Sequence, residues 1–171
     1  MIRNINELSE NEKKFLKILL SRGNICDSEI SKTTGLSKAT VGRIRKNLER
    51  NLITEYLPVI ELDKAGIEVF ATLLFEWKGF PDKELTKKVF SRLSKDPNTI
   101  FMANGQGSES LSTVLFLGFT GIAEYHNYFK SFREEYGDSV GKVVTLILPS
   151  KEIVKQDFTD LIKKQLGEKN E

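Results

Sequence analysis

The stretch that decides the fold is ICDSEISKTTGLSKATVGRIRKNLERNLI, residues 25–53. Its pattern predicts two short helices joined by a tight turn. Gly35 favours the left-handed backbone of such a turn, and the hydroxyl of Ser37 can cap the helix that follows. Three aliphatic side chains of the second helix recur at the spacing of one buried face: Val41, Ile44 and Leu48. This layout is typical of the helix-turn-helix motif, which places its second helix in the major groove of DNA.

The opposite side of the second helix is predicted to be basic and polar. The residues expected to contact base edges or phosphates are Ser37, Lys38, Thr40, Arg43, Arg45, Lys46, Asn47 and Arg50. Arg45 lies near the buried face, so it is either structural or directed at a phosphate. Gly42 costs about 1 kcal/mol relative to alanine inside a helix, a cost that is either tolerated or offset by close approach of a DNA backbone. A charged helix face is often only a solvated surface, but the order of turn glycine, cap and buried face favours DNA binding.

Size and charge restrict the classes of protein that fit. The 171 residues, 39% of them hydrophobic, are enough for two small domains and argue against a disordered chain. The net charge is only +2, so affinity for DNA must come from the local basic cluster. A single cysteine, Cys26, excludes an intrachain disulfide and a multi-cysteine zinc site. Because the sequence shows neither a signal peptide nor an apolar stretch of membrane-spanning length, we expect a cytoplasmic protein with no membrane partner.

The first domain is predicted to be a winged helix-turn-helix domain over residues 1–62. Ser9 followed by Glu12 forms a capping box, which begins a helix that packs behind the two already described. After the basic helix, residues 52–57 and 59–62 are short runs of strand-forming residues separated by a proline. These runs predict a small wing or an extended exit strand.

The polar residues 63–66 have the composition of a hinge, and a second domain is predicted at residues 67–150. Its predicted strands and helices follow the order strand, helix, strand, strand, helix, strand: residues 67–77, 81–93, 99–103, 111–119, 122–136 and 143–148. This is the βαββαβ order of a ferredoxin-like unit. The fold class is therefore predicted to be α+β.

The C-terminal segment, residues 151–171, predicts an amphipathic helix followed by a frayed tail. Its apolar residues at helical spacing are Val154, Phe158, Leu161 and Ile162. Since the chain shows no third layer, this apolar face either caps the sheet of the second domain or meets another subunit.

The order of these elements resembles the leucine-responsive and asparagine-synthase regulators (Lrp/AsnC), a family of prokaryotic transcription factors. The resemblance runs from about residue 8 to residue 148 and is most specific in the first domain. The matching residues are Ile18, Leu19, Gly23, Glu29, Ile30, Gly35, Leu36, Ser37, Arg43, Ile44, Leu48, Glu49, Ile53 and Gly66. The chain departs from the family pattern at Asn51, where glycine is common, and at Cys26, where a capping serine is common.

The resemblance implies a sequence-specific regulator that forms a homodimer or higher oligomer through residues 67–166 and binds a pseudo-palindromic operator in double-stranded DNA. In many members, an amino acid or another small metabolite binds at subunit contacts near a glycine turn. The effector-site candidates by resemblance are Gly105, Gln106, Gly107, Ser108 and Glu109, whose backbone amides can hold a carboxylate. A glycine-rich hairpin turn without a ligand explains the same residues equally well.

The sequence contains no recognisable catalytic or cofactor motif. Gly105-Gln106-Gly107 is not a dinucleotide fingerprint, because Ser110 takes the place of the third glycine. The single histidine, His126, has no accompanying cluster of metal ligands. We therefore expect no cofactor, no metal and no enzyme activity.

Two alternative functions remain open. The first is an enzyme of the same two-domain layout that resembles these regulators but decarboxylates tetrapyrroles. Arg92 and Arg133 are the only arginines after Arg50, which argues against a cavity for such a polyanionic macrocycle. The second is a metabolite-binding or protein-interaction module whose first domain contacts a protein. Salt-insensitive binding to a protein partner, with none to duplex DNA, would favour it.

Overall fold

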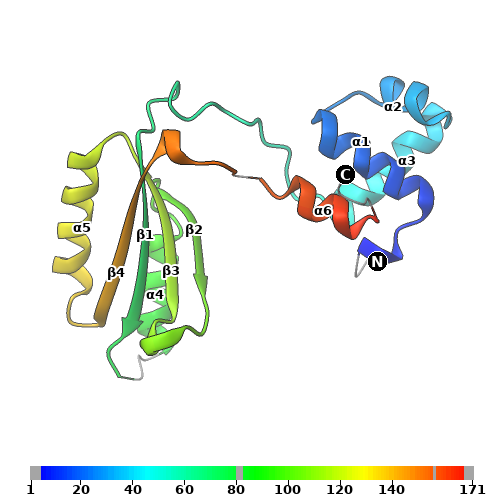
Figure 1. The fold of residues 1–171 in the computed structure, drawn as a ribbon. Helices are drawn as coiled ribbons and strands as arrows, with labels where there is room; N and C mark the ends of the chain where they lie inside the picture. The colour runs from blue at the N-terminus through cyan, green and yellow to red at the C-terminus, as the bar shows by residue number, and fades with distance from the viewer. Residues whose placement is uncertain (1–4, 80–82, 156, 168–171) are drawn as a thin grey trace. The chain divides into compact units, whose positions relative to one another are not determined.

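The computed structural model describes residues 5–79, 83–155 and 157–167. They divide into two compact units (Figure 1). The first unit contains the residues up to Val59 and those from Lys155 onward, and the second runs from Ile60 to Val154. None of the described helices is long and apolar enough to cross a membrane.

The first unit is helical. Its elements are η1 (Ile5–Glu7), α1 (Glu10–Arg22), α2 (Asp27–Thr34), α3 (Lys38–Asn51) and α6 (Thr159–Gln165). The predicted capping box begins α1: the Glu12 amide donates to Ser9 Oγ at 3.4 Å, and the Ser9 amide donates to Glu12 Oε2 at 2.9 Å. The residues that form the core of this unit are Leu8, Phe15, Leu16, Leu19, Ile25, Ile30, Val41, Ile44, Leu48 and Leu166.

The C-terminal segment differs from the predicted single helix over residues 151–166. Only α6 forms a regular α-helix there, and it lies against α1 (Figure 1). Leu166 is buried in the core of the first unit and Ile162 packs on it, whereas the Phe158 side chain is 73% exposed. Two segments from opposite ends of the chain thus share one hydrophobic core, so α6 does not cap the sheet.

The two strands predicted at residues 52–57 and 59–62 are not formed, and this correction removes the wing from the first unit. Pro58 cannot donate a ladder hydrogen bond, and neither run has a partner strand. Leu57 and Val59 are accordingly exposed. The segment is held to α3 by the Tyr56 hydroxyl, which donates to Glu49 Oε1 at 2.9 Å.

The second unit has the predicted βαββαβ order. Its elements are β1 (Val69–Trp77), α4 (Lys83–Leu93), β2 (Thr99–Asn104), η2 (Ser108–Ser110), β3 (Thr113–Phe119), α5 (Ile122–Tyr136), β4 (Val140–Pro149) and η3 (Ser150–Glu152). The strands form one antiparallel sheet in the order β2-β3-β1-β4. The first two residues of the helix predicted at 81–93, and the tail predicted after Gly167, lie outside the described residues.

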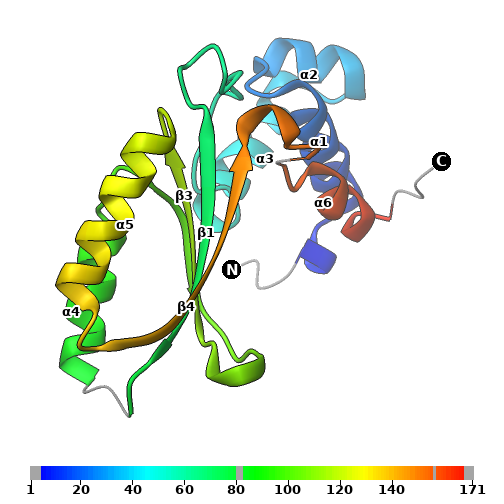
Figure 2. The same ribbon diagram turned by 60° about the vertical axis from the view of Figure 1, so that its left-hand side comes forward.

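The two faces of this sheet differ. α4 and α5 cover the same face, as Figure 2 shows. The strand residues buried on that covered face include Ala71, Leu73, Phe75, Leu115, Leu117 and Phe119. The opposite face, here called the open face, carries apolar residues at the alternate positions: Phe70, Leu74, Phe101, Val114, Phe116, Val144 and Leu146. Leu146 is 58% and Phe101 52% exposed, so apolar surface remains in contact with solvent there.

Candidate nucleic-acid interface

The turn between α2 and α3 is fixed by local hydrogen bonds. Gly35 has φ of 73°, the left-handed conformation that glycine adopts without strain, and its amide donates to the Ser31 carbonyl at 2.9 Å. Ser37 caps α3, because its Oγ accepts from the Thr40 amide at 3.1 Å. The hydroxyl of Ser31 also donates to the Leu36 carbonyl at 2.6 Å. These contacts set the direction in which α3 leaves the turn.

The predicted buried face of α3 is confirmed. Val41, Ile44 and Leu48 are all buried in the core of the first unit. The opposite side of the helix presents exposed cationic side chains, here called the basic face: Lys38, Arg43, Lys46 and Arg50. Because the buried residues fix the rotation of the helix, the basic face points into solvent.

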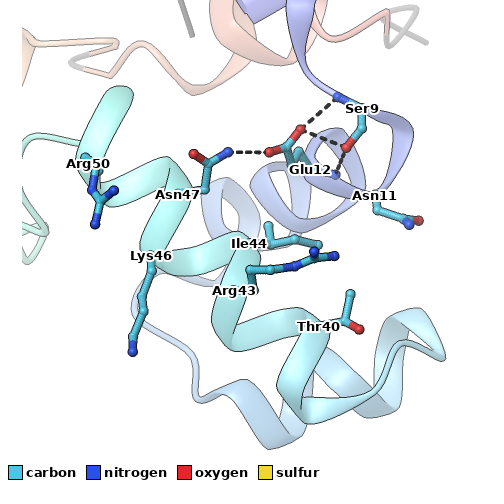
Figure 3. A pocket seen from close by; sticks show the side chains of 9 residues that line it. All are labelled: Ser9, Asn11, Glu12, Thr40, Arg43, Ile44, Lys46, Asn47 and Arg50. Carbon is cyan, nitrogen blue, oxygen red and sulfur yellow. Dashed lines mark hydrogen bonds between the residues drawn. The ribbon is translucent and has the colours of Figure 1, made fainter. Parts of the chain in front are cut away.

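A groove of about 530 Å³ runs between α3 and the start of α1 (Figure 3). Five of the eight residues predicted to contact DNA line it: Thr40, Arg43, Lys46, Asn47 and Arg50. Ser37, Lys38 and Arg45 lie outside the lining. Among the described residues, Arg43, Lys46 and Arg50 form neither a hydrogen bond nor an ion pair, so their donors are available to an external ligand. Figure 3 shows Arg43 extended toward α1 and Lys46 pointing away from it.

Asn47, predicted to contact a base edge or a phosphate, forms hydrogen bonds within the protein. It is half-buried, and its side-chain amide donates to Glu12 Oε1 at 2.6 Å. The Asn51 amide in turn donates to Asn47 Oδ1 at 2.9 Å. Asn47 therefore joins α3 to α1, a contact that connects residues 35 positions apart and that local patterns do not reveal.

Glu12 is the acidic residue in the lining of this groove, and its charge is already compensated. Burial works to raise the pKa of Glu12, but hydrogen bonds from Ser9 and Asn47, together with the nearby positive charge of Arg43, lower it below the ordinary value. The carboxylate therefore stays ionised and bound to the protein. It leaves the Arg43 guanidinium without a direct ion pair.

For Arg45, the structure favours the structural role over the phosphate contact. Its guanidinium donates from Nε to Asp27 Oδ1 and from Nη2 to the Ile25 carbonyl, both at 2.6 Å. It also lies 5.3 Å from the centroid of the Phe15 ring, within the range of a cation–π contact. These partners bind α3 to α2 and α1, and the side chain is only 16% exposed.

Gly42 faces α2. A Cβ atom built on Gly42 would lie 3.4 Å from Asp27 Oδ2, close to van der Waals contact. The residue is half-buried and does not line the groove. The close approach that Gly42 permits is therefore between two helices of the protein.

The glycine turn predicted as an effector site lies between β2 and β3. The Gly105 amide donates to the Ser112 carbonyl and the Gly107 amide to the Leu111 carbonyl, each at 2.8 Å. Two of the amides expected to hold a carboxylate are therefore used within the turn itself. Glu109 pairs with Lys142, which lowers the pKa of the Glu109 carboxyl. A cavity of about 290 Å³ lies beside the turn, lined by residues 105–108 and by open-face residues that include Leu74 and Val114.

Comparison with known sequences places the chain near helix-turn-helix regulators. No family model matches it. It is 35% identical over 94 residues to the HTH-type transcriptional regulator FL11 of Pyrococcus horikoshii, a match that covers 54% of this chain and 60% of that protein. FL11 of Pyrococcus furiosus is 30% identical over 83 residues, or 48% of this chain and 55% of that protein. The chain thus spans somewhat more than half the length of the curated relatives it matches.

Comparison with solved structures shows the fold. An AsnC family transcriptional regulator from Agrobacterium tumefaciens superposes with a TM-score of 0.77 at 17% identity, covering 87% of this chain and 94% of that one. A transcriptional regulator of Neisseria meningitidis in complex with L-Met superposes with a TM-score of 0.71 at 15% identity, and the match covers 90% of this chain and 99% of that one. Escherichia coli AsnC superposes with a TM-score of 0.69 at 12% identity, and the match covers 88% of this chain and 97% of that one. The resemblance to Lrp/AsnC regulators is thereby confirmed for the fold.

Proposed function

We propose that this chain, which has the fold of the Lrp/AsnC regulators, is a sequence-specific DNA-binding transcriptional regulator that acts as a dimer or larger assembly. The observation that carries the proposal is the basic face of α3, whose cations are exposed and, among the described residues, unpaired. Two copies of α3 held at a fixed distance would read successive major-groove half-sites of a pseudo-palindrome. Regulators of this kind act in the cytoplasm and need no catalytic activity.

The roles of the α3 residues follow from their positions. Arg43 and Lys46 line the groove in the middle of α3, which suits contacts with base edges once the N-terminal part of the helix enters the major groove. Lys38 and Arg50 lie toward the two ends of α3 and suit phosphate contacts. Asn47 and Arg45 hold α3 in place through Glu12 and Asp27.

Dimerisation is assigned to the open face of the sheet. Leu74 lies opposite Val144 and Val114 in the register, and Thr72 lies opposite Leu146 and Phe116. This register builds a continuous apolar surface across β3, β1 and β4. A second copy that presents the same surface would remove it from water, as expected for a two-fold interface.

An effector site is assigned to the cavity beside the glycine turn. The cavity adjoins the open face through Leu74 and Val114, so a ligand there would lie close to the proposed dimer contact. An amino acid or another small metabolite suits its volume, and a structural neighbour from Neisseria meningitidis was solved with L-Met. Binding would regulate by favouring one subunit arrangement over another.

Selection of bound fragments from genomic DNA tests the proposal. We expect the full chain to enrich a palindromic motif, and Arg43→Ala to weaken both affinity and sequence preference. Lys130→Ala removes an exposed cation of α5 and serves as the matched control. Failure to enrich any sequence, with negligible duplex binding at low salt, would contradict the proposal and favour the protein-contact or enzyme alternatives.

A further inference from the structure

The groove between α3 and the start of α1 has a second wall, to which the proposed DNA-binding roles assign nothing. The α3 wall carries exposed cations of the basic face. The α1 wall is formed by Ser9, Asn11 and Glu12. A molecule that fills this groove of about 530 Å³ would therefore meet both helices.

Asn11 is the residue of the α1 wall whose side chain is free to bind an external group. Ser9 Oγ donates to Glu12 Oε2 at 2.7 Å and accepts from the Glu12 amide, so these two residues satisfy each other. Glu12 Oε1 accepts from Asn47. Asn11 is exposed, and among the described residues its side chain has no hydrogen-bond partner. Its side-chain amide can therefore donate to an acceptor outside the protein.

The charge of the groove favours an anionic ligand. Among the described residues that line it, three cations on α3 stand against one carboxylate, that of Glu12. This carboxylate already accepts hydrogen bonds from Ser9 and Asn47. Glu10, on the same turn of α1, lies outside the lining and pairs with Lys13 at 3.0 Å. The wall that contains Asn11 is therefore open to a negatively charged group.

The dimensions of duplex DNA place a phosphate backbone beside a helix that lies in the major groove. An α-helix with its side chains is about 10–12 Å across and the major groove is about 12 Å wide, so the helix fills the groove from one strand to the other. Protein surface that flanks the inserted helix then lies over a sugar-phosphate backbone. The groove beside α3 is such a surface. In Figure 3, Arg43 extends from α3 toward α1, and Asn11 projects from the start of α1.

We propose that Asn11 contacts a phosphate of the bound duplex, so that α1 as well as α3 belongs to the DNA interface. The phosphate would accept a hydrogen bond from the Asn11 amide, and the positive charge of Arg43 on the facing wall would favour its approach. Because the phosphates are the same in every sequence, Asn11 positions α3 on the duplex without reading bases. This role rests on the proposed function and extends the interface beyond the basic face.

Two substitutions of Asn11 in the full chain, measured with the selected operator across salt concentrations, test this role. Asn11→Ala should weaken binding about tenfold, because a hydrogen bond to a charged group is lost, and should leave the salt slope unchanged. Asn11→Lys places a cation at the phosphate, so the slope of log affinity against log salt should become steeper by about 0.9 for each bound subunit. A role in stability alone would not steepen the slope.

The matched controls are Asn127→Ala and Asn127→Lys, which change an exposed asparagine of α5. They should bind with the affinity and slope of the unmodified chain. Thermal denaturation checks that all four variants are folded. If Asn11→Lys does not fold, the affinity of Asn11→Ala decides the outcome.

The role of Asn11 is overturned if both of its variants bind as the Asn127 controls do. It is also overturned if Asn11→Lys binds with an unchanged slope, because a cation added at a phosphate must release a counterion. The two proposals fail in different ways. If the unmodified chain binds no duplex, the proposed function fails and the role of Asn11 fails with it. If Arg43→Ala weakens binding and the Asn11 variants do not, only the role of Asn11 fails.

Discussion

The side-chain amide of Asn47 on α3 donates a 2.6 Å hydrogen bond to the carboxylate of Glu12 on α1. The same carboxylate accepts from the backbone amide and hydroxyl of Ser9, so one acidic side chain both caps α1 and holds α3. The position of the basic face therefore depends on a residue near the start of the chain.

Removing the α3 end of this contact should cost stability. Asn47→Ala leaves the half-buried Glu12 with one partner fewer, and we expect the free energy of unfolding to fall by about 1–2 kcal/mol. Urea denaturation at neutral pH measures it. Asn11→Ala, an exposed residue of the same groove, should change stability by less than about 0.5 kcal/mol. Equal effects of the two substitutions would show that the Asn47–Glu12 bond contributes nothing.

The lowered pKa of Glu12 predicts a dependence of stability on acid. A carboxyl group whose pKa is lower in the folded state stabilises the fold above its unfolded pKa, and that contribution disappears as pH falls through the folded pKa. The loss should therefore occur below the ordinary value of 4.5. Glu12→Gln should flatten this part of the curve of unfolding free energy against pH, whereas Glu55→Gln, an exposed carboxylate of the same unit, should retain it. Identical curves for both variants would assign the acid sensitivity to other groups.

Arg45 should behave as a stability residue. Arg45→Ala removes the partners of Asp27 and of the Ile25 carbonyl, and we expect unfolding to become easier by about 1–3 kcal/mol. Arg50 is exposed and lies five positions after Arg45 on the same helix. Arg50→Ala should therefore lower the free energy of unfolding by less than about 0.5 kcal/mol. Thermal denaturation of both variants separates the two roles. A larger loss of stability for Arg50→Ala would reverse the assignment.

The return of α6 to the first unit can be tested by truncating one buried side chain. Leu166→Ala should lower the free energy of unfolding of the first unit by about 2–3 kcal/mol, because Leu166 is buried in its core. Leu161→Ala is the matched control, since Leu161 is 58% exposed on the same helix. If the two variants unfold at the same urea concentration, α6 does not share that core.

Local sequence patterns predicted the elements whose determinants lie close together in the chain. The Ser9–Glu12 capping box, the turn at Gly35 and the buried face of α3 all follow from residues a few positions apart. The βαββαβ order followed from alternating strand and helix patterns. The predicted strands after α3 failed because strand propensity without a partner strand does not make a strand.

The contacts that the sequence did not reveal are those between distant residues. Asn47 and Arg45 have the composition and helix position of DNA contacts, but Glu12 and Asp27 bind them. Ile162 was predicted on the apolar face of an amphipathic helix, but such a pattern identifies an apolar face without identifying its partner, here the core that contains Leu166. The groove between α3 and the start of α1 combines residues from two helices that are distant in the sequence, so it appears only once the unit is folded.

The most direct test of the central claim is the salt dependence of duplex binding, measured with the selected operator and four single alanine variants. Each phosphate contact contributes about −0.9 to the slope of log affinity against log salt. We predict that Arg43→Ala, Lys46→Ala and Arg50→Ala each weaken binding. Arg50→Ala removes a phosphate contact, so it should also reduce the magnitude of the slope by about one unit. Lys130→Ala should leave affinity and slope unchanged. If the three α3 variants bind with the same affinity and slope as the unmodified chain, the assignment of α3 as the DNA-reading helix is contradicted.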